Sequence, residues 1–390
     1  MSSSHRATPH LATPHLATPG GQTRARALGI PFDGGPGALN SITDLAGIEI
    51  GYSTIIRGEG PLVVGEGPVR TGVTAILPRG KAGLATPVFA GCHSLNGNGE
   101  MTGFAWIEEA GRVEGPITIT NTHSCGLARD ATLRWLVDRG LLADGWGLPV
   151  AAETYDGHLN DINGFHLRES HVFEALDSAA GGPIEEGSIG GGTGMICYGF
   201  KGGSGTASRA VEAGGGRFTL GAFVQANFGA AEQLTIAGVP LGRRLIAAAS
   251  DSPDAGSIIG VVATDAPLLP HQLKRLARRC GLGIARSGLV AAHTSGDIFL
   301  AFSTANMDAL RESGERDGAG PDGAAQRQLD FLPDAALTPL FAATVQAIDE
   351  AVIDALVANQ AMTGRDGFTV PALPHDQVRA FLAEHKRLVE

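Results

Sequence analysis

Short runs of apolar residues alternate with glycine-containing turns along most of the chain. Most runs are five to ten residues long, and several are apolar at both odd and even positions. A run of this kind is typical of a β-strand that is covered on both faces. We therefore predict strands at Val73–Leu77, Pro87–Gly91, Ile117–Thr120, Met195–Phe200, Phe218–Asn227, Ser257–Ala263 and Asp297–Ser303.

Helical periodicity appears between these runs. Ser124 is a suitable N-cap for a helix that ends near Asp138, with Leu127, Leu133 and Leu136 facing inward. Stripes of apolar residues predict three more helices: one that Pro270 opens and Gly281 ends, one from Thr338 to Leu356, and one from about Asp376 to Leu388.

The start of the chain differs from the rest. Residues 7–19 read ATPHLATPHLATP, a low-complexity repeat that cannot bury a core, so we expect residues 1–29 to form a disordered tail. Residues 30–390 are expected to fold as a single domain. Within it, residues 311–334 are charged, rich in glycine and proline and without periodicity, which predicts a surface loop. The one GxGxxG pattern, Gly318–Gly323, lies in this loop and follows no strand, so we treat it as a chance match.

Composition narrows the class of protein. A net charge of −11 argues against nucleic acid or a membrane surface as the main partner. The four cysteines are widely separated and form no CxxC pair, which fits buried thiols in a reducing compartment. There is no apolar stretch of signal-peptide or transmembrane type, so we expect a cytoplasmic protein. No histidine pair has helical spacing, and we expect no metal site.

Glycine is unusually frequent, with 57 residues in a chain of 390. That is about twice the usual share and indicates many tight turns and close backbone contacts. The run Gly190–Gly194 leaves two interpretations open. Its N–H groups can cradle an anion, or its glycines can let one backbone segment pass close to another.

The junction between Gly256 and Ser257 suggests a chemistry. Here a flexible polar segment runs into an apolar strand, and a hydroxyl follows the least hindered residue. Hydrolases that cut their own backbone need this arrangement, because the serine hydroxyl attacks the preceding carbonyl in an N-to-O acyl shift. Hydrolysis of the ester then leaves an N-terminal serine, whose α-amine has a pKa of roughly 7.7–8.0 and can help to activate the hydroxyl.

Several segments, in the same order along the chain, resemble signatures of the L-aminopeptidase/D-esterase family, which includes DmpA and the β-peptidyl aminopeptidases. The resemblance covers the chain from about Ile30 onward and is carried by Asn40–Gly51, Asn98–Gly103, Glu153–Asp156, Gly191–Met195, Val224–Gly229, Gly256–Ile259 and Ser295–Phe299.

This resemblance implies a fold and a maturation step. The family fold is a four-layer α/β/β/α sandwich, similar to the N-terminal-nucleophile hydrolases in architecture but differently connected. The precursor would cut itself between Gly256 and Ser257, giving an α chain of residues 1–256 and a β chain of residues 257–390. The resemblance further implies that no cofactor is needed and that the processed units form a homo-oligomer.

The resemblance also assigns roles. Ser257 would be the nucleophile, Glu153 would bind the free amine of the substrate, and Asn227 would form the oxyanion hole. The Tyr155 hydroxyl could supply a second donor there. No histidine lies in a motif that would make it the general base. Two ways of activating Ser257 therefore stay open: its own new α-amine, and a relay through Ser295 oriented by Asp297.

The sequence thus predicts a self-cleaving serine aminopeptidase that releases N-terminal residues from short peptides, amides or esters, including those with D- or β-residues. One alternative is a self-processing acyltransferase of the ornithine acetyltransferase type, but that family uses threonine, and Ser257 counts against it. The other is an inactive binding protein on the same fold. The combination of Ser257, Asn227, Ser295 and Asp297 argues against inactivity.

Overall fold

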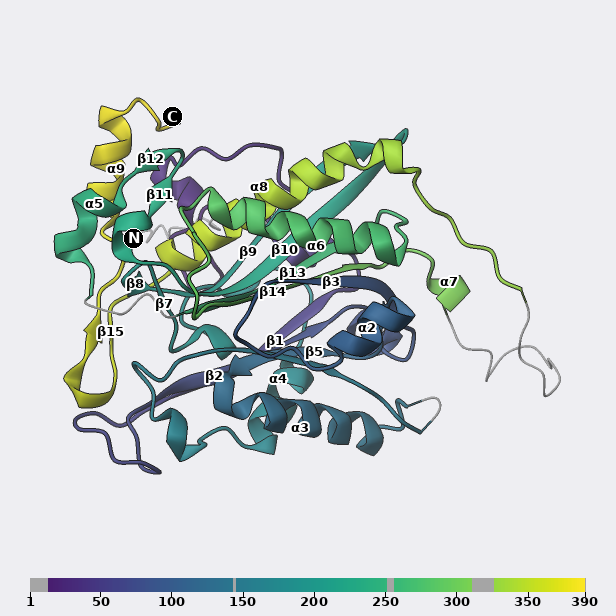
Figure 1. The fold of residues 1–390 in the computed structure, drawn as a ribbon, viewed down its shortest axis with the longest axis horizontal. Coiled ribbons are helices and arrows are strands. Elements are labelled where there is room, and N and C mark those ends of the chain that lie inside the picture. Colours follow the sequence, from purple (N-terminus) through teal and green to yellow (C-terminus); the bar gives the residue numbers. More distant parts are fainter. Residues whose placement is uncertain (1–12, 143–144, 251–255, 311–325, 390) are drawn as a thin grey trace, which may run out of the picture.

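The computed structural model describes residues 13–142, 145–250, 256–310 and 326–389. Two β-sheets are stacked face to face, and a layer of helices covers the outer face of each (Figure 1). One apolar core lies between the two sheets. A further core lies between each sheet and the helices that cover it. The predicted four-layer α/β/β/α sandwich is therefore confirmed.

The larger sheet has six strands, and the strand that begins at Ser257 lies in its interior. This strand pairs parallel with one neighbour and antiparallel with the other, whereas the remaining pairs are antiparallel. The order across the sheet is β4 (Arg112–Val113), β3 (Val88–Gly97), β14 (Gly296–Ser303), β13 (Ser257–Thr264), β10 (Gly216–Asn227) and β9 (Gly203–Ala213).

The smaller sheet has four strands in the order β1 (Glu49–Arg57), β2 (Val69–Leu77), β5 (Ile117–Asn121) and β6 (Val150–Thr154). Helices α3 (Cys125–Asp138) and α4 (Glu169–Ser178) cover its outer face, and α6 (Pro270–Ala285) and α8 (Thr338–Val357) cover the larger sheet (Figure 1). The remaining elements lie outside the two main sheets. The helices are α1 (Gly80–Gly83), α2 (Phe104–Ala110), α5 (Gly242–Leu245), α7 (Met307–Leu310) and α9 (His375–Glu384). The two-residue strand pairs are β7 (Ile196–Cys197) with β8 (Phe200–Lys201), which is buried, β11 (Thr235–Ile236) with β12 (Val239–Pro240), and β15 (Met362–Thr363) with β16 (Thr369–Val370).

Strand β13 is buried along its whole length, as its continuous apolar sequence predicted. Ile258 and Val262 pack in the core under the helices, whereas Ile259 and Val261 pack in the core between the sheets. Because side chains alternate along a strand, Ser257 lies on the face that looks toward the smaller sheet.

Two predicted elements differ in the structure at glycine residues. The segment Met195–Phe200 is a tight hairpin rather than one strand, since Tyr198 and Gly199 both have positive φ angles of 52° and 72°. Helix α6 continues past Gly281 to Ala285. Its second glycine, Gly283, is needed for packing, because a Cβ there would lie 2.8 Å from the Ile348 Cβ of α8.

Helix α3 forms where it was predicted, but its buried face is only partly the expected one. Leu136 is buried as predicted, whereas Leu127 is 37 % exposed and Ala128, Ala131 and Trp135 face the sheet instead. The small alanines let the helix lie close to β5 and β6. The cap also differs, because the Asn121 side chain accepts the N–H of Ser124, while Ser124 itself makes no capping bond. Helix α9 ends at Glu384, short of the expected Leu388.

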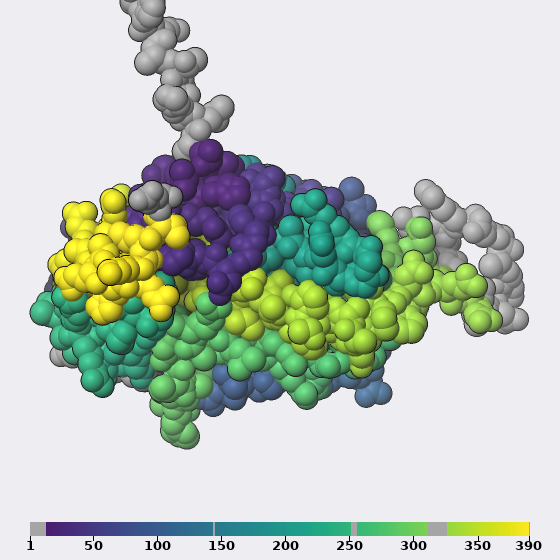
Figure 2. All heavy atoms as spheres, turned by 90° about the horizontal axis from the view of Figure 1, so that it is seen from above, coloured from purple at the N-terminus to yellow at the C-terminus, as the bar shows by residue number. Residues whose placement is uncertain are grey.

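The described part of the expected tail, residues 13–29, is packed against the domain rather than disordered. The Arg24 side chain is 3 % exposed, and its guanidinium forms ion pairs with Glu186 at 2.6 Å and with Asp354 of α8 at 2.9 Å. Figure 2 shows this N-terminal segment against the C-terminal one, where the Val389 N–H donates to the Gly29 carbonyl at 2.9 Å. A buried arginine between two carboxylates therefore anchors the segment that follows the low-complexity repeat.

Residues 1–12 of the expected tail lie outside the described residues, as do residues 311–325 of the expected loop with the Gly318–Gly323 pattern. Residues 326–331 are exposed. Within the described ranges, no helix is both long enough and apolar enough to cross a bilayer.

Candidate active site

Ser257 stands at the first position of β13, with its side chain 6 % exposed. It is paired with Asn227, the last residue of β10, in the antiparallel ladder. On the other side, the N–H of Gly296 donates to the Ser257 hydroxyl oxygen at 3.2 Å. The hydroxyl oxygen is therefore held as a hydrogen-bond acceptor at the N-terminal end of β13.

Gly256 occupies a position with no room for a side chain. A Cβ built there would lie 1.8 Å from the Asn227 carbonyl oxygen and 2.7 Å from its carbonyl carbon. Both are backbone atoms in a paired strand, so neither can move aside cheaply. Steric crowding alone thus requires glycine on the N-terminal side of Ser257.

The side chain of Asn227 is held by two backbone groups. Its Oδ1 accepts the N–H of Ile196 at 2.8 Å, and its Nδ2 donates to the Tyr155 carbonyl at 2.9 Å. Because Oδ1 must face the Ile196 N–H, these contacts define which end of the amide is the donor. The amide is therefore oriented before any substrate arrives.

Glu153 lies near the end of β6, with 3 % of its surface exposed. One carboxylate oxygen accepts the N–H of Glu100 at 2.9 Å, and the other accepts the Thr122 hydroxyl. Burial raises the pKa of Glu153 above its ordinary value, and these hydrogen bonds oppose that shift. A cation bound beside this carboxylate would favour its charged form.

Gly99 lies between Glu153 and Gly296, the residue whose N–H contacts Ser257. A Cβ on Gly99 would lie 3.1 Å from the Glu153 Oε1 and 3.3 Å from the Gly296 Cα. The structure therefore brings Glu153 close to the strand start that contacts Ser257.

Ser295 and Asp297 lie where β14 begins, and both are buried. The Ser295 hydroxyl donates to the Asp297 Oδ1 at 2.6 Å, so the expected pair is formed. Among the described residues, the hydroxyl of Ser257 bonds to Gly296 rather than to Ser295.

Tyr155 follows β6 directly and contacts Asn227 through its backbone carbonyl. Its ring meets that of His158 edge to face at 5.4 Å, and a Cβ on Gly157 would lie 2.3 Å from its hydroxyl oxygen. The phenol thus folds over Gly157.

Comparison with known protein families identifies the family of this chain. The model of peptidase family S58 matches residues 40–370. The chain belongs to peptidase family S58. It is 50 % identical to the β-peptidyl aminopeptidase BapA of Sphingosinicella microcystinivorans, over 94 % of this chain and 93 % of that protein. A second β-peptidyl aminopeptidase BapA, from Sphingosinicella xenopeptidilytica, is 46 % identical over 91 % of this chain and 90 % of its own length.

Solved structures agree with this assignment. The L-aminopeptidase D-Ala-esterase/amidase of Ochrobactrum anthropi, described as a variant of the Ntn hydrolase fold, has a TM-score of 0.84 and 49 % identity, covering 94 % of this chain and 99 % of that one. A Burkholderia sp. β-aminopeptidase has a TM-score of 0.81 and 44 % identity, covering 93 % and 99 %. The predicted family and enzyme class, a serine aminopeptidase of the L-aminopeptidase/D-esterase type, are confirmed.

Two backbone hydrogen bonds in the site of this S58 peptidase were not predicted from the sequence. The N–H groups of Gly296 and Ile196 bind Ser257 and Asn227, but neither residue has a side chain that suggests chemistry. Gly296 lies between Ser295 and Asp297, which is the one signal that could have drawn attention to it. Backbone donors of this kind become visible only when the strand register is known.

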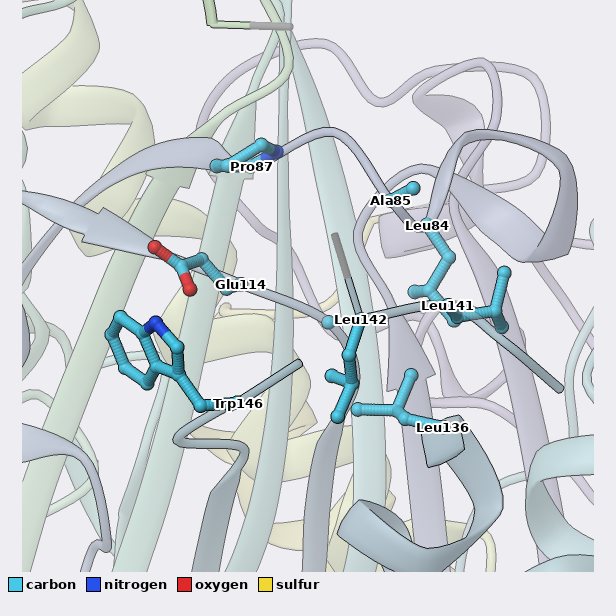
Figure 3. Close-up of a pocket in the computed structure, with 10 residues that line it drawn as sticks. Leu84, Ala85, Pro87, Glu114, Leu136, Leu141, Leu142 and Trp146 are labelled. Atoms are coloured by element: carbon cyan, nitrogen blue, oxygen red, sulfur yellow. The ribbon is translucent and has the colours of Figure 1, made fainter. Parts of the chain in front are cut away.

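The described parts of the chain contain no group of three histidine, cysteine or acidic side chains that could hold a metal ion. A surface pocket lies elsewhere, between the C-terminal end of α3 and the segment that leads to β3 (Figure 3). Leu84, Pro87, Leu136, Leu142 and Trp146 line it, and none of these residues belongs to the candidate site.

Proposed function

We propose that this S58 peptidase cuts its own chain between Gly256 and Ser257 and then uses Ser257 to release N-terminal residues from short peptides, amides or esters. The observation that carries the proposal is the crowding of Gly256 against the Asn227 carbonyl, immediately before a buried serine at the start of an interior strand. A glycine is needed there, and the following hydroxyl is adjacent to the peptide carbonyl that it would attack.

In the first reaction, the Ser257 hydroxyl oxygen attacks the carbonyl carbon of Gly256. The peptide nitrogen of Ser257 leaves and takes up the hydroxyl proton, so an ester replaces the amide. Water then hydrolyses the ester, which gives a carboxylate on Gly256, a free α-amine on Ser257 and the restored hydroxyl. The Ser295–Asp297 pair is the group available to assist this step, because no free amine exists on Ser257 before the cut.

In each later turnover, Glu153 holds the ammonium group of the substrate through a charge-assisted hydrogen bond. Ser257 attacks the first carbonyl carbon of the substrate, and the Asn227 amide, with Tyr155 as a second donor, stabilises the oxyanion. The leaving amine or alcohol departs with a proton, and water hydrolyses the acyl-enzyme to free the N-terminal residue.

The names of the relatives support a substrate class. Two are β-peptidyl aminopeptidases, and one is a D-Ala-esterase/amidase as well as an L-aminopeptidase. We propose that N-terminal β-residues are substrates here and that D-residue amides and esters are accepted too. The homo-oligomeric assembly and the cytoplasmic location stay predictions.

The test is electrophoresis of the purified protein under denaturing conditions. We expect two bands from the wild type, of residues 1–256 and 257–390, with the smaller one beginning Ser-Ile-Ile-Gly. Ser257→Ala should give one uncut band and no hydrolysis of amino-acid p-nitroanilides, because both reactions need the same oxygen. An active wild-type enzyme that remains one uncut chain would contradict the proposal.

A further inference from the structure

A lysine is buried behind the candidate oxyanion hole. Lys201, in β8, has no exposed surface, and its ammonium group donates to the carbonyls of Met195 and Gly202, both at 2.8 Å, and of Gly192 at 3.5 Å. Within the described residues, it forms no ion pair with a carboxylate. Three backbone oxygens therefore surround a cation in the interior of the protein.

The glycine run explains how this cage forms. A Cβ on Gly192 would lie 2.4 Å from the Ser204 backbone nitrogen, and one on Gly194 would lie 2.2 Å from the Arg70 carbonyl oxygen. The glycines therefore allow close backbone packing, the second of the two interpretations of this run. The turn directs carbonyl oxygens toward a cation rather than N–H groups toward an anion.

The peptide unit between Met195 and Ile196 connects this lysine to Asn227. Its carbonyl oxygen accepts from the Lys201 Nζ at 2.8 Å, and its N–H donates to the Asn227 Oδ1 at 2.8 Å. The Asn227 Nδ2 in turn donates to the Tyr155 carbonyl at 2.9 Å. All three hydrogen bonds are donated in the same direction, from the ammonium group through the Asn227 amide to the Tyr155 carbonyl.

Hydrogen bonds in such a chain strengthen one another, because each acceptor group becomes a better donor at its far end. A positive charge at the first carbonyl makes the Ile196 N–H more positive. That N–H, bound to Oδ1, makes the amide hydrogens of Asn227 more positive as well. The second hydrogen on Nδ2 is the one that an oxyanion would accept.

We propose that Lys201 is a positioning residue that orients and polarises the Asn227 amide through the Met195–Ile196 peptide and so strengthens the oxyanion hole. This inference rests on the proposed role of Asn227.

A cation at this place is costly for folding. Burial is the largest influence on Lys201 and lowers its pKa from 10.5 to about 7, so the charged form is disfavoured there. A methionine has a similar length and would fill the same space without a charge, but the Met195 and Gly202 carbonyls would lose the Nζ donor.

The test is a double-mutant cycle on processed enzyme with Lys201→Met and Asn227→Ala. Lys201→Met should lower kcat about tenfold, which is less than the loss of a whole oxyanion donor, with KM nearly unchanged. In the Asn227→Ala background, the same substitution should change kcat by less than about twofold, because the amide on which it acts is gone. Asn359→Ala is the matched control, since the Asn359 amide supports the same hairpin through the Lys201 and Gly202 carbonyls but not through Nζ or Met195. It should leave kcat near the wild-type value.

An unchanged kcat in Lys201→Met, or an equal loss in both backgrounds, would overturn the relay. A normal kcat in Asn227→Ala alone would instead refute the proposed oxyanion role, so the two failures are distinguishable. If Lys201→Met does not fold, Lys201→Gln replaces it. Its uncharged amide can still donate to Met195, and we expect a smaller loss of kcat that again disappears in the Asn227→Ala background.

Discussion

Gly256, on the N-terminal side of the proposed cut, occupies a position where a side chain has no room. The Asn227 carbonyl occupies the space that any Cβ at this position would need. The residue types at the junction were evident in the sequence, but the reason for glycine was not. It depends on the pairing of Ser257 with Asn227, two residues from distant parts of the chain.

We expect Gly256→Ala to slow self-cleavage at least about tenfold, because the added methyl group must displace the Asn227 backbone that orients the oxyanion donor. The measurement is the fraction of uncut chain against time after synthesis. Gly126→Ala, in α3, is the matched control, since a Cβ there meets nothing within 4 Å. It should process normally and gain up to about 1 kcal/mol in the free energy of unfolding. Normal processing of Gly256→Ala would show that the junction can relax.

Glu153 gives a second prediction at the scale of one residue. Glu153→Gln should lower kcat/KM for amino-acid p-nitroanilides at least about tenfold, because a buried carboxylate that binds a cation is replaced by a neutral amide. Self-cleavage should continue, since that reaction involves no substrate amine. Equal cleavage of N-acetylated and free-amine substrates by the wild type would contradict the assignment.

The same residue should produce a pH dependence. Its pKa is raised, mainly by burial, so the carboxylate takes up a proton at a higher pH than an ordinary glutamate does. Since substrate binding needs the charged form, kcat/KM should fall as the pH drops through this raised pKa, and the acid limb should disappear in Glu153→Gln. A limb that persists in the variant would belong to another group.

At the scale of elements, β14 carries the pair that is expected to assist Ser257. Ser295→Ala and Asp297→Asn should each slow self-cleavage as well as turnover, because the first cut has no free α-amine to use. Rates of processing and kcat should be measured for both variants. Ser303→Ala, at the other end of the strand, removes a buried hydroxyl that donates to the Ala266 carbonyl at 2.7 Å. It should cost roughly 1 kcal/mol in stability and leave both rates unchanged.

If both Ser295→Ala and Asp297→Asn process at the wild-type rate and keep full kcat, the α-amine of Ser257 suffices. The relay through Ser295 should then be discarded.

The elements that sequence predicted best are those whose pattern directly reflects burial. Strands β10, β13 and β14 are continuous apolar runs, and each was located to within a few residues. Strand β9 was missed because its start, Gly-Ser-Gly-Thr, reads as a turn. A Cβ on Gly205 would lie 2.0 Å from the Ala351 carbonyl oxygen, so this glycine allows α8 to lie directly on the strand. Only the packed structure provides that reason.

At the scale of the whole molecule, resemblance rather than periodicity predicted the four layers. Periodicity gave strands and helices but not the order of strands in each sheet. The buried ion pairs of the N-terminal segment could not be predicted from the sequence either. The partners of Arg24, Glu186 and Asp354, lie more than 150 residues away along the chain.

The Arg24–Asp354 pair would join the two chains after the cut, because Arg24 belongs to the α chain and Asp354 to the β chain. The Arg24–Glu186 pair would lie within the α chain. Arg24→Met should lower the free energy of unfolding by about 3–5 kcal/mol, since it leaves two buried carboxylates without their cation. Thermal denaturation of the processed protein measures the loss. The control is Arg134→Met, which removes an exposed pair with Asp138 and should cost less than about 1 kcal/mol.

The loss in Arg24→Met should grow with pH. Burial, the largest influence on both acids, raises the pKa of Asp354 to about 6 and that of Glu186 to about 8. An acid whose folded pKa exceeds its unfolded value contributes stability at low pH that is lost as the pH rises through the folded pKa. At pH 5 both carboxyl groups are protonated, so the loss of the arginine costs less stability. At pH 8.5 both are charged, so the loss of the arginine costs more. A loss that is the same at both pH values would contradict this account.

The position of β13 inside the larger sheet has a consequence for the lifetime of the processed enzyme. Before the proposed cut, β10 and β13 are parts of one chain, so they pair within one molecule. After it, β13 would begin a separate polypeptide, and its pairing with β10 would be an association of two molecules whose rate depends on concentration. If the two polypeptides unfold and are diluted, they would no longer reassemble, and inactivation would be irreversible. The half-life of the mature enzyme would then be determined by its unfolding rate.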